Sequence, residues 1–389
     1  MSHNAKAKKK VLIVYPFYMH YRKPVIDELI QNGRHDYFFA GDTQDQKTGI
    51  ETCKVEPPER FLKIKNFYLG NVLLQFGVLR LLFRHRFDCV ILLGNAAWPT
   101  IWSTAVVARL VGKRVLFWTH GWISRERGIR GLLRNTLYRL GHGMLLYGHT
   151  AKRIGIDNGF SEDRLYVAYN ALDYANQSKI RDAVSDDEKQ SVRYLFQNSE
   201  LPIVICSSRL TPQRRLGLLF DAAVKLRQTG QEINILLVGS GPERENLESH
   251  AKDSGLNVHF YGACYDEQKL AAMTMASTAT VAPGKIGLTA IQSLTYGTPV
   301  ITHGNSDNQM PEFEAVVPGD NGDLFVDGDI DSLATVIAKW IGMSEEVTKH
   351  YRVVAERYNP TLQRQVFDAA VDGSDISQVP YQDEPCWVS

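Results

Sequence analysis

The chain has 389 residues, of which 44% are hydrophobic and 22% are charged. This composition excludes an intrinsically disordered chain, and the length exceeds the roughly 100 to 200 residues of one typical domain, which predicts two domains. The net charge of +1 hides an asymmetry, because residues 60–153 contain 16 Lys and Arg but only 2 Asp and Glu.

The five cysteines are scattered, without the spacing of a zinc site or of a disulfide framework. A reduced cytosolic compartment is therefore expected. No apolar run long enough for a secretory signal follows the first ten residues, and the most apolar stretch, Val72–Phe83, is shorter than the roughly 20 residues that span a bilayer. We expect neither a secretory signal nor a transmembrane helix.

Short apolar runs alternate with amphipathic stretches, which is typical of parallel sheets covered by helices on both faces. Pro24 fits a first helical turn, and Gly33 and Gly112 fit helix ends. The strands predicted in the first half are Val11–Tyr15, Tyr37–Ala40, Cys89–Leu93, Val115–Thr119, Met144–Tyr147 and Leu165–Ala168. Those predicted in the second half are Ile203–Cys206, Ile235–Val238, Val258–Tyr261, Thr280–Ala282 and Val300–Thr302.

The basic block interleaves its charges with large apolar residues, as in Lys63–Leu69 and Arg125–Arg139. Such segments are typical of helices that lie on an anionic membrane surface, where each Lys or Arg adds about 1 kcal/mol. A solvated basic face over an apolar core stripe is the alternative. Nucleic-acid binding is less favoured, because the aromatic residues do not form a stacking platform. The expected location is the cytoplasm, peripherally on the inner face of the cell membrane.

The segment 173–202 is polar and contains an acidic run, which predicts a domain junction. We predict an α/β protein with a membrane-facing, acceptor-binding domain over residues 1–172 and a donor-binding domain over residues 173–358. Residues 359–389 are expected to form a C-terminal helix and tail that pack back on the first domain. Two doubly wound domains facing a central cleft bind ligands at the carboxyl ends of their strands.

Two segments of the second domain are typical of phosphate binding. Arg209 and Arg214 follow its first predicted strand, where guanidinium groups can bind a diphosphate through charge-assisted hydrogen bonds, and Arg215 is expected to be a plain loop residue. In Pro283–Val300, a flexible loop precedes a helix whose first amides, at Gly287, Leu288 and Thr289, face an anion. No acidic pair accompanies them, so no metal or other cofactor is expected.

The turn in Val238–Glu243 follows a predicted strand and precedes a predicted helix. It is a weak match to a dinucleotide-binding turn, because the third glycine is missing. A tight strand-to-helix turn is the alternative.

Five segments in this order resemble the donor domain of retaining GT-B glycosyltransferases of family 4: RLTPQR, VGSGPERENL, FYGACYDEQKL, APGKIGLTAIQSLTYGTPVI and MPEFEAVVPGDNGDLF. The resemblance covers roughly residues 160–345 well and the first domain only loosely. It implies a GT-B fold of two Rossmann-like domains. It also implies transfer of a sugar from a nucleotide diphosphate to an acceptor, with retention and without a metal.

The resemblance also implies roles for single residues. Arg209 and Arg214 match the family's diphosphate-binding cations, and His120, in WTHG, matches a histidine near the transferred sugar. The implied donor-binding residues are Gly262, Ala263, Cys264, Lys285, Gly287, Leu288, Thr289, Gln292 and Glu312.

The chain departs from the family at three places. The family's two glutamates fall on Gly284 and Gln292. Gln292 retains an acceptor oxygen for ribose, whereas Gly284 retains nothing, which leaves Lys285, Glu312 or Glu314 as sugar contacts. The glycine-rich first loop is replaced by an aromatic stretch, so Tyr18 and His20 are expected to bind the acceptor or its lipid. Arg125 is expected to join them from the basic block.

The sequence thus predicts a retaining glycosyltransferase that modifies a lipid-linked saccharide in surface polysaccharide or glycolipid biosynthesis. Its expected partners are a nucleotide-sugar donor, a lipid-linked or oligosaccharide acceptor and an anionic membrane, with no nucleic acid. Three alternatives remain open: a catalytically silent nucleotide-sugar-binding subunit, a GT-B-type sugar-nucleotide epimerase, and a nucleic-acid-binding protein.

Overall fold

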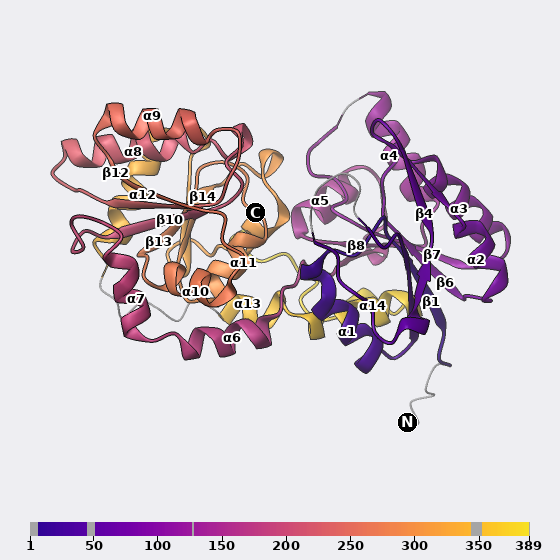
Figure 1. The fold of residues 1–389 in the computed structure, drawn as a ribbon. Helices are drawn as coiled ribbons and strands as arrows, with labels where there is room; N and C mark the ends of the chain where they lie inside the picture. Colours follow the sequence, from indigo (N-terminus) through magenta and orange to yellow (C-terminus); the bar gives the residue numbers. More distant parts are fainter. Residues whose placement is uncertain (1–6, 45–50, 127, 344–351, 389) are drawn as a thin grey trace. The chain divides into compact units, whose positions relative to one another are not determined.

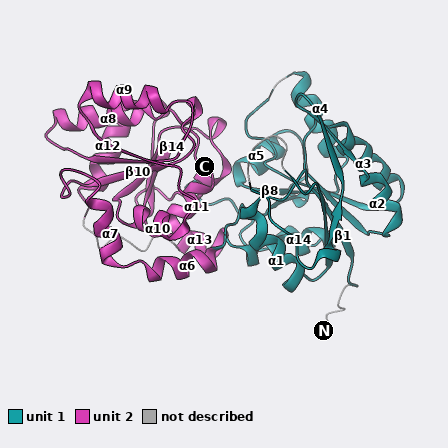
Figure 2. Cartoon of the chain, in the orientation of Figure 1, with its two compact units in different colours: residues 1–173, 359–389 teal, residues 174–358 magenta. Residues whose placement is uncertain are grey.

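The computed structural model describes residues 7–44, 51–126, 128–343 and 352–388 (Figure 1). Two compact units divide the chain: unit 1 contains Met1–Asp173 and Asn359–Ser389, and unit 2 contains Tyr174–Tyr358 (Figure 2). The chain therefore passes from one unit to the other twice. Within the described residues, no helix is both long enough and apolar enough to cross a membrane.

Unit 1 is built on a seven-stranded sheet whose strands are all parallel, in the order β3-β2-β1-β6-β7-β8-β9. Most of these strands are continuous apolar runs buried on both faces, as expected for a covered parallel sheet. Their bounds are β1 Lys10–Val14, β2 Asp36–Gly41, β3 Phe61–Lys63, β6 Cys89–Leu92, β7 Arg114–Thr119, β8 Gly143–Leu146 and β9 Leu165–Val167.

Helices cover both faces of this sheet. One face packs against α2, α3, α4 and α5 through a single hydrophobic cluster, and the other packs against α1 and the C-terminal α14. The helix bounds are α1 Lys23–Asn32, α2 Val78–Arg84, α3 Pro99–Leu110, α4 Ile129–Arg139, α5 His149–Asp157 and α14 Pro360–Asp372.

Unit 2 contains a six-stranded parallel sheet in the order β12-β11-β10-β13-β14-β15. Alternate residues of β10 and β11 enter two separate clusters, one against α8, α9 and α12 and the other against α7 and α10. The strands are β10 Ile203–Ser207, β11 Asn234–Val238, β12 Asn257–Gly262, β13 Ala279–Ala282, β14 Val300–His303 and β15 Gly322–Phe325. The helices are α6 Tyr174–Ala183, α7 Asp186–Arg193, α8 Gly217–Gln228, α9 Arg244–Ser254, α10 Glu267–Met275, α11 Leu288–Thr295, α12 Ile330–Ile341 and α13 Arg352–Arg357.

The prediction of a helix over Lys63–Leu69 is wrong. This segment runs into an antiparallel hairpin of β4, Lys65–Leu69, and β5, Val72–Phe76. Asn66 faces inward and receives a hydrogen bond of 3.3 Å from Gln75 Nε2 on the opposite strand, whereas Phe67 and Leu69 face outward. The period of two in this short segment, with a turn at Gly70, outweighs its resemblance to an amphipathic helix.

The segment 173–202, predicted to be a domain junction, contains α6 and α7, and most of it packs within unit 2. Ser185 is the N-cap of α7, and its side chain accepts from Glu188 N–H in a capping box. Strands β3 and β15 were not predicted.

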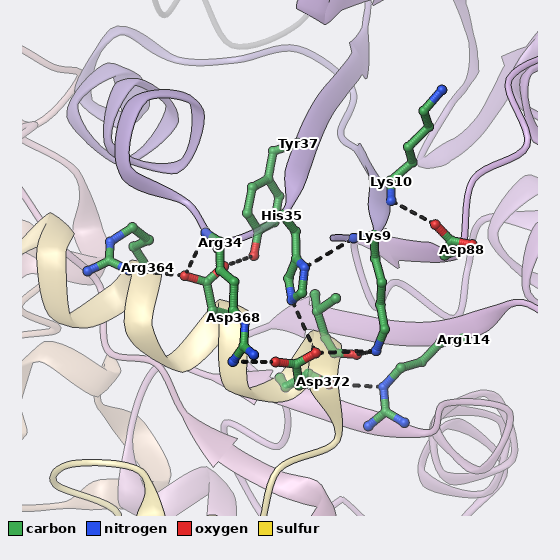
Figure 3. A network of polar contacts seen from close by, with 12 residues as sticks. Lys9, Lys10, Arg34, His35, Tyr37, Asp88, Arg114, Arg364, Asp368 and Asp372 are labelled. Atoms are coloured by element: carbon green, nitrogen blue, oxygen red, sulfur yellow. Dashed lines mark hydrogen bonds and ion pairs between the residues drawn. The ribbon is translucent and has the colours of Figure 1, made fainter. Parts of the chain in front are cut away.

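Helix α14 is held to the rest of unit 1 by two carboxylates, those of Asp368 and Asp372 (Figure 3). Asp372 has a side chain only 1% exposed, and its carboxylate forms an ion pair of 2.9 Å with Arg34 and one of 3.4 Å with Lys9. His35 lies 3.4 Å away, and its Nδ1 accepts from Lys9 N–H, so its proton is on the Nε2 that faces Asp372. One turn earlier, Asp368 accepts a 2.8 Å hydrogen bond from Tyr37.

Asp372→Ala should destabilise unit 1, because Lys9 and Arg34 lose a buried counter-charge, although their own side chains are 31% and 44% exposed and can be hydrated. Removing a hydrogen bond to a charged group costs about 1.5 to 3 kcal/mol. Urea unfolding of the full chain measures the loss. Asp331→Ala is the matched control, since Asp331 pairs with Lys225 at an exposed site, and it should cost less than about 1 kcal/mol. Equal losses in the two variants would contradict a structural role for the buried pair.

Candidate functional site

In unit 2, the loop after β10 presents Arg209 at the carboxyl edge of the sheet. Its neighbours are anchored by their backbones: Ser208 N–H donates to Val238 O at 2.9 Å, and Leu210 N–H donates to Ser240 O at 3.0 Å. The Arg209 side chain is exposed and has no hydrogen bond or ion pair to any other described residue. It is therefore a charge held on a fixed loop and available to a ligand.

The glycine turn after β11 makes this loop possible. Gly239 has φ +147, and a Cβ on it would lie 1.9 Å from Ser208 O. Only glycine permits such an approach and such a backbone conformation. The turn in Val238–Glu243 therefore serves close packing, which agrees with the tight-turn alternative and not with a dinucleotide fingerprint.

Arg214 joins this loop to the one that follows β13. It ends the 3₁₀ turn η4, Pro212–Arg214, and its guanidinium donates to the carbonyl oxygen of Lys285. The two backbones touch beside it, because a Cβ on Gly284 would lie 2.2 Å from Gln213 O and 2.8 Å from the carbonyl carbon of Arg214. A glutamate at position 284 is therefore sterically excluded in this arrangement, which explains the departure from the family pattern.

Gln309 fixes the same loop from the other side. It is 2% exposed, its Oε1 accepts from Ile286 N–H at 2.7 Å, and its Nε2 donates to Thr302 Oγ1 at 2.9 Å. No sequence signal points to Gln309, because its partners are brought near it only by the fold. The segment predicted as a flexible loop is thus held at Ile286 and Lys285.

Helix α11 starts at this loop, with Gly287 as its N-cap. The first amides of a helix have no partner within the helix, and its dipole is positive at this end. Thr289 Oγ1 donates to Ser207 O at 3.1 Å, which ties the helix to the end of β10. The space enclosed behind the loop is only about 10 Å³, whereas a Cβ on Gly287 would meet nothing within 4 Å. A diphosphate would therefore lie outside the loop, beside Gly287.

Gln292 faces a carboxylate that the sequence did not single out. Its Nε2 donates to Glu267 Oε1 at 2.9 Å, and the same oxygen accepts from Gln177 and from Tyr296. Burial, and after it the nearby Glu267, raises the pKa of Tyr296, so its hydroxyl remains a donor. The carboxylate missing at position 292 is present beside it, carried by α10.

The other predicted donor residues lie on the same sheet edge or near it. Gly262 ends β12, and its carbonyl accepts from Gly239 N–H at 2.8 Å, so the Gly262–Cys264 turn adjoins the glycine turn. Lys285 is half-buried. Glu312 lies in the 3₁₀ turn η6, Pro311–Ala315, which packs against α11, and is 2% exposed. Contact of Lys285 or Glu312 with a donor sugar stays a prediction.

Unit 1 contains a separate cavity of about 730 Å³ at the carboxyl edge of its own sheet. The loops after β1, β6 and β7 line it, together with α4 and the β4–β5 hairpin. His120 lies in its wall, with its ring centroid 4.7 Å from that of Tyr147. Burial, with a smaller effect from the charge of Arg22, lowers the pKa of His120 to about 4. The imidazole is therefore neutral at neutral pH.

The three residues predicted to bind the acceptor do not line this cavity. Tyr18 is 2% exposed, and its hydroxyl donates to Ile13 O at 2.9 Å, so it serves packing. His20 is exposed to solvent. Arg125 is also exposed and pairs with Asp157 at 3.2 Å. The cavity instead contains Arg22, directly after the aromatic stretch in which Tyr18 and His20 were noticed.

The prediction of a basic apolar helix over Arg125–Arg139 is confirmed for α4. Ile129, Leu132 and Leu133 are 77%, 63% and 48% exposed on its outer side, and the hairpin exposes Phe67, Leu69 and Phe76. We name these six residues the apolar rim. Exposed large apolar side chains of this kind are typical of a protein or membrane interface.

Comparison with known proteins gives a family match in unit 2. Residues 187–356 match the model of glycosyl transferases group 1. A GDP-mannose-dependent alpha-(1-6)-phosphatidylinositol monomannoside mannosyltransferase of Mycolicibacterium smegmatis is 26% identical over 272 residues, which cover 63% of this chain and 68% of the relative. The protein of the same name from Mycobacterium tuberculosis is 28% identical over 252 residues, and the match spans 62% of its length, less than two thirds.

Solved structures show the fold. HepE of Anabaena in complex with UDP superposes with a TM-score of 0.70 at 17% identity, covering 94% of this chain and 100% of the other. A glycosyltransferase from Rickettsia africae gives 0.71 at 15% identity, covering 94% and 98%. The chain therefore has the predicted GT-B fold of two Rossmann-like domains, and the family match and relatives together support a glycosyltransferase.

Gly284→Glu should displace the Gln213–Arg214 backbone and with it the Arg214 guanidinium. We expect the affinity for a nucleoside diphosphate to fall at least about tenfold, which is about 1.4 kcal/mol, by titration calorimetry. Gly304→Ala is the control in the same unit, because a Cβ there meets Leu324 at an ordinary 3.5 Å. Unchanged affinity in Gly284→Glu would show that the contact at position 284 does not support a diphosphate site.

Proposed function

We propose that the chain is a retaining, metal-independent glycosyltransferase. It moves a sugar from a nucleotide-diphospho-sugar to a lipid-linked saccharide in glycolipid or surface polysaccharide biosynthesis. The relatives named above use GDP-mannose and a phosphatidylinositol mannoside, and HepE binds UDP. These names support the class of donor and acceptor, not a particular sugar or base.

One observation carries this proposal: the loop that contains Arg209 and Arg214 is in direct contact with the loop that precedes α11. Arg214 contacts Lys285 across Gly284, and the open N-terminus of α11 lies next to it. Two guanidinium groups and a helix N-terminus at the same edge of the sheet would thereby supply the positive charge that two linked phosphates require. This positive charge would take the place of a metal ion.

In the proposed mechanism, the bond between the anomeric carbon and the diphosphate breaks as the acceptor hydroxyl attacks from the same face. The hydroxyl proton passes to a phosphate oxygen, and the leaving diphosphate gains negative charge. Arg209, Arg214 and the α11 amides stabilise that charge in the transition state. His120, which is neutral because of its lowered pKa, would act as a hydrogen-bonding group toward the sugar and not as a cation.

The absence of a carboxylate at position 284 favours one alternative, a catalytically silent subunit that binds nucleotide sugars. In this arrangement no side chain longer than glycine fits there, so a sugar hydroxyl must find another partner. Incubation with labelled nucleotide sugars and lipid-linked acceptors distinguishes the transferase from the silent subunit, and both from an epimerase. Label in the lipid fraction supports transfer, binding without turnover supports the silent subunit, and formation of an epimer supports an epimerase.

Arg209→Ala should weaken binding of UDP, GDP or ADP, because a hydrogen bond to a charged group contributes about 1.5 to 3 kcal/mol. Binding of the corresponding nucleoside should change little. Calorimetry on both ligands tests this, with Arg215→Ala as the control from the same loop, since Arg215 pairs with Asp327. An equal loss for nucleoside and nucleotide would remove the phosphate role of Arg209.

We also propose that unit 1 docks on an anionic membrane, at the inner face of the cell membrane, through the apolar rim and the basic residues of α4. Leu132→Gln with Leu133→Gln should reduce cosedimentation with phosphatidylglycerol vesicles, and added salt should release the protein, because it screens the charges. Val326→Gln, an exposed apolar site in unit 2, is the control. Binding that ignores both the substitutions and salt would contradict this docking.

A further inference from the structure

Arg22 is a buried cation at the floor of the unit 1 cavity. It ends the 3₁₀ turn η1, His20–Arg22, is 6% exposed and lines the cavity. Aromatic rings surround its guanidinium: the carbon at its centre lies 4.3 Å from the ring centroid of Trp118 and 5.2 Å from that of Tyr15. Its Nη2 donates to the Tyr147 hydroxyl at 2.6 Å.

No carboxylate in the described part of the chain forms an ion pair with Arg22. Its Nε is buried and has no hydrogen-bond partner there. This is unusual for the chain, since the other deeply buried cation, Lys152, pairs with Glu162 at 2.8 Å. The aromatic faces offset only part of the cost of burying a charge.

The other charges that face the cavity do not neutralise Arg22. Arg130 and Arg134 line it from α4, and Glu126, its one acidic residue among those described, pairs with Arg134 at 2.9 Å. Three arginines and one glutamate thus line a space of about 730 Å³. Because a guanidinium cannot lose its proton in a protein, Arg22 keeps a positive charge that no described residue pairs with, and this charge is available to an anionic ligand.

The cavity wall mixes polar and apolar side chains, and an apolar one carries it onto the surface. Leu133 lines the cavity and also belongs to the apolar rim, whereas Tyr68 lines it from the face of the hairpin opposite to that of Phe67 and Leu69. A ligand that reaches Arg22 with an anionic group can therefore leave an alkyl chain along Leu133 and the α4 part of the rim.

We propose that Arg22 binds the phosphate that joins the acceptor's sugar to its lipid. The site takes a phosphate monoester or diester carried on a lipid, with the phosphate against the guanidinium and the chain along the apolar rim. This inference rests on the proposed function, and it assigns the acceptor's charge to a residue outside the donor site.

The test compares lipid phosphates with matched neutral lipids on the full chain. We expect tighter binding of farnesyl phosphate than of farnesol by at least about tenfold, a usual loss when a charged hydrogen bond is removed. Arg22→Gln should abolish that preference and leave the binding of the neutral lipid unchanged. Arg22→Lys should retain part of it. Arg60→Gln is the control, since Arg60 also lies over a ring, that of Phe38 at 4.7 Å, but pairs with Asp36 and does not line the cavity.

A second readout separates a binding role from a structural one. Arg22 is the charged group that acts on His120, so Arg22→Gln should raise the pKa of His120 from its low value in an NMR titration. An anion bound at Arg22 should raise the pKa of His120 in the wild-type protein as well. A residue that only supports the aromatic rings would produce no shift on adding farnesyl phosphate or dihexanoyl phosphatidylinositol.

Equal binding of charged and neutral lipids by the wild-type chain would overturn the proposal. A preference that survives in Arg22→Gln would overturn it too. Inorganic phosphate that binds as tightly as the lipid phosphates would show a site for a free anion instead. Nucleoside diphosphate binding, measured on the same samples, keeps the two proposals apart: its absence would refute the glycosyltransferase function, whereas its presence without phosphate-dependent lipid binding would refute only the role of Arg22.

Discussion

The parallel arrangement of both sheets decides where every functional group of this chain lies. Because all strands of a parallel sheet end at the same edge, the loops after β1, β6 and β7 meet around one cavity, and those after β10 and β13 meet at the start of α11. Helices cover both faces of each sheet, so the loops at its edge are where these side chains can reach a ligand. Arg22, His120, Arg209 and Arg214 all lie in segments that follow the end of a strand.

The two sites hold their cations in opposite ways. Arg209 is exposed on a loop fixed by backbone hydrogen bonds, so it is fully hydrated before a ligand arrives and loses that water on binding. Arg22 is only 6% exposed, and aromatic rings surround its guanidinium. An anion reaching Arg22 therefore gains an interaction that is weakly screened. The first arrangement suits a ligand that must leave after each reaction. The second suits selection of a ligand that carries a negative charge.

Much of the fold was predictable from local pattern, because β1, β6, β8 and β11 are apolar runs that no amphipathic helix would show. The β4–β5 hairpin was predicted to be a helix, because the charged and large apolar residues of Lys63–Leu69 fit both the helical period of 3.6 and the strand period of two. Only the pairing with the second strand shows which structure forms. The family pattern pointed to Arg214 and Gly284, and the structure places their backbones in contact. The sequence could not reveal Gln309, Glu267 or Arg22, since each acts through partners far along the chain, and a buried cation without a counter-charge has no local signature.

The departures at positions 284 and 292 have related physical consequences. A carboxylate at 284 would collide with the backbone of Gln213 and would also place negative charge beside Arg214, where two phosphates are proposed to bind. Glycine removes both obstacles and lets Arg214 reach the carbonyl of Lys285. At 292 the carboxylate is not lost but moved, because Glu267 on α10 accepts from Gln292, Gln177 and Tyr296. No carboxylate therefore lies at the start of α11, where the helix dipole attracts anions. The Glu267 carboxylate lies beside the second turn of α11, away from the end where the diphosphate is proposed to bind.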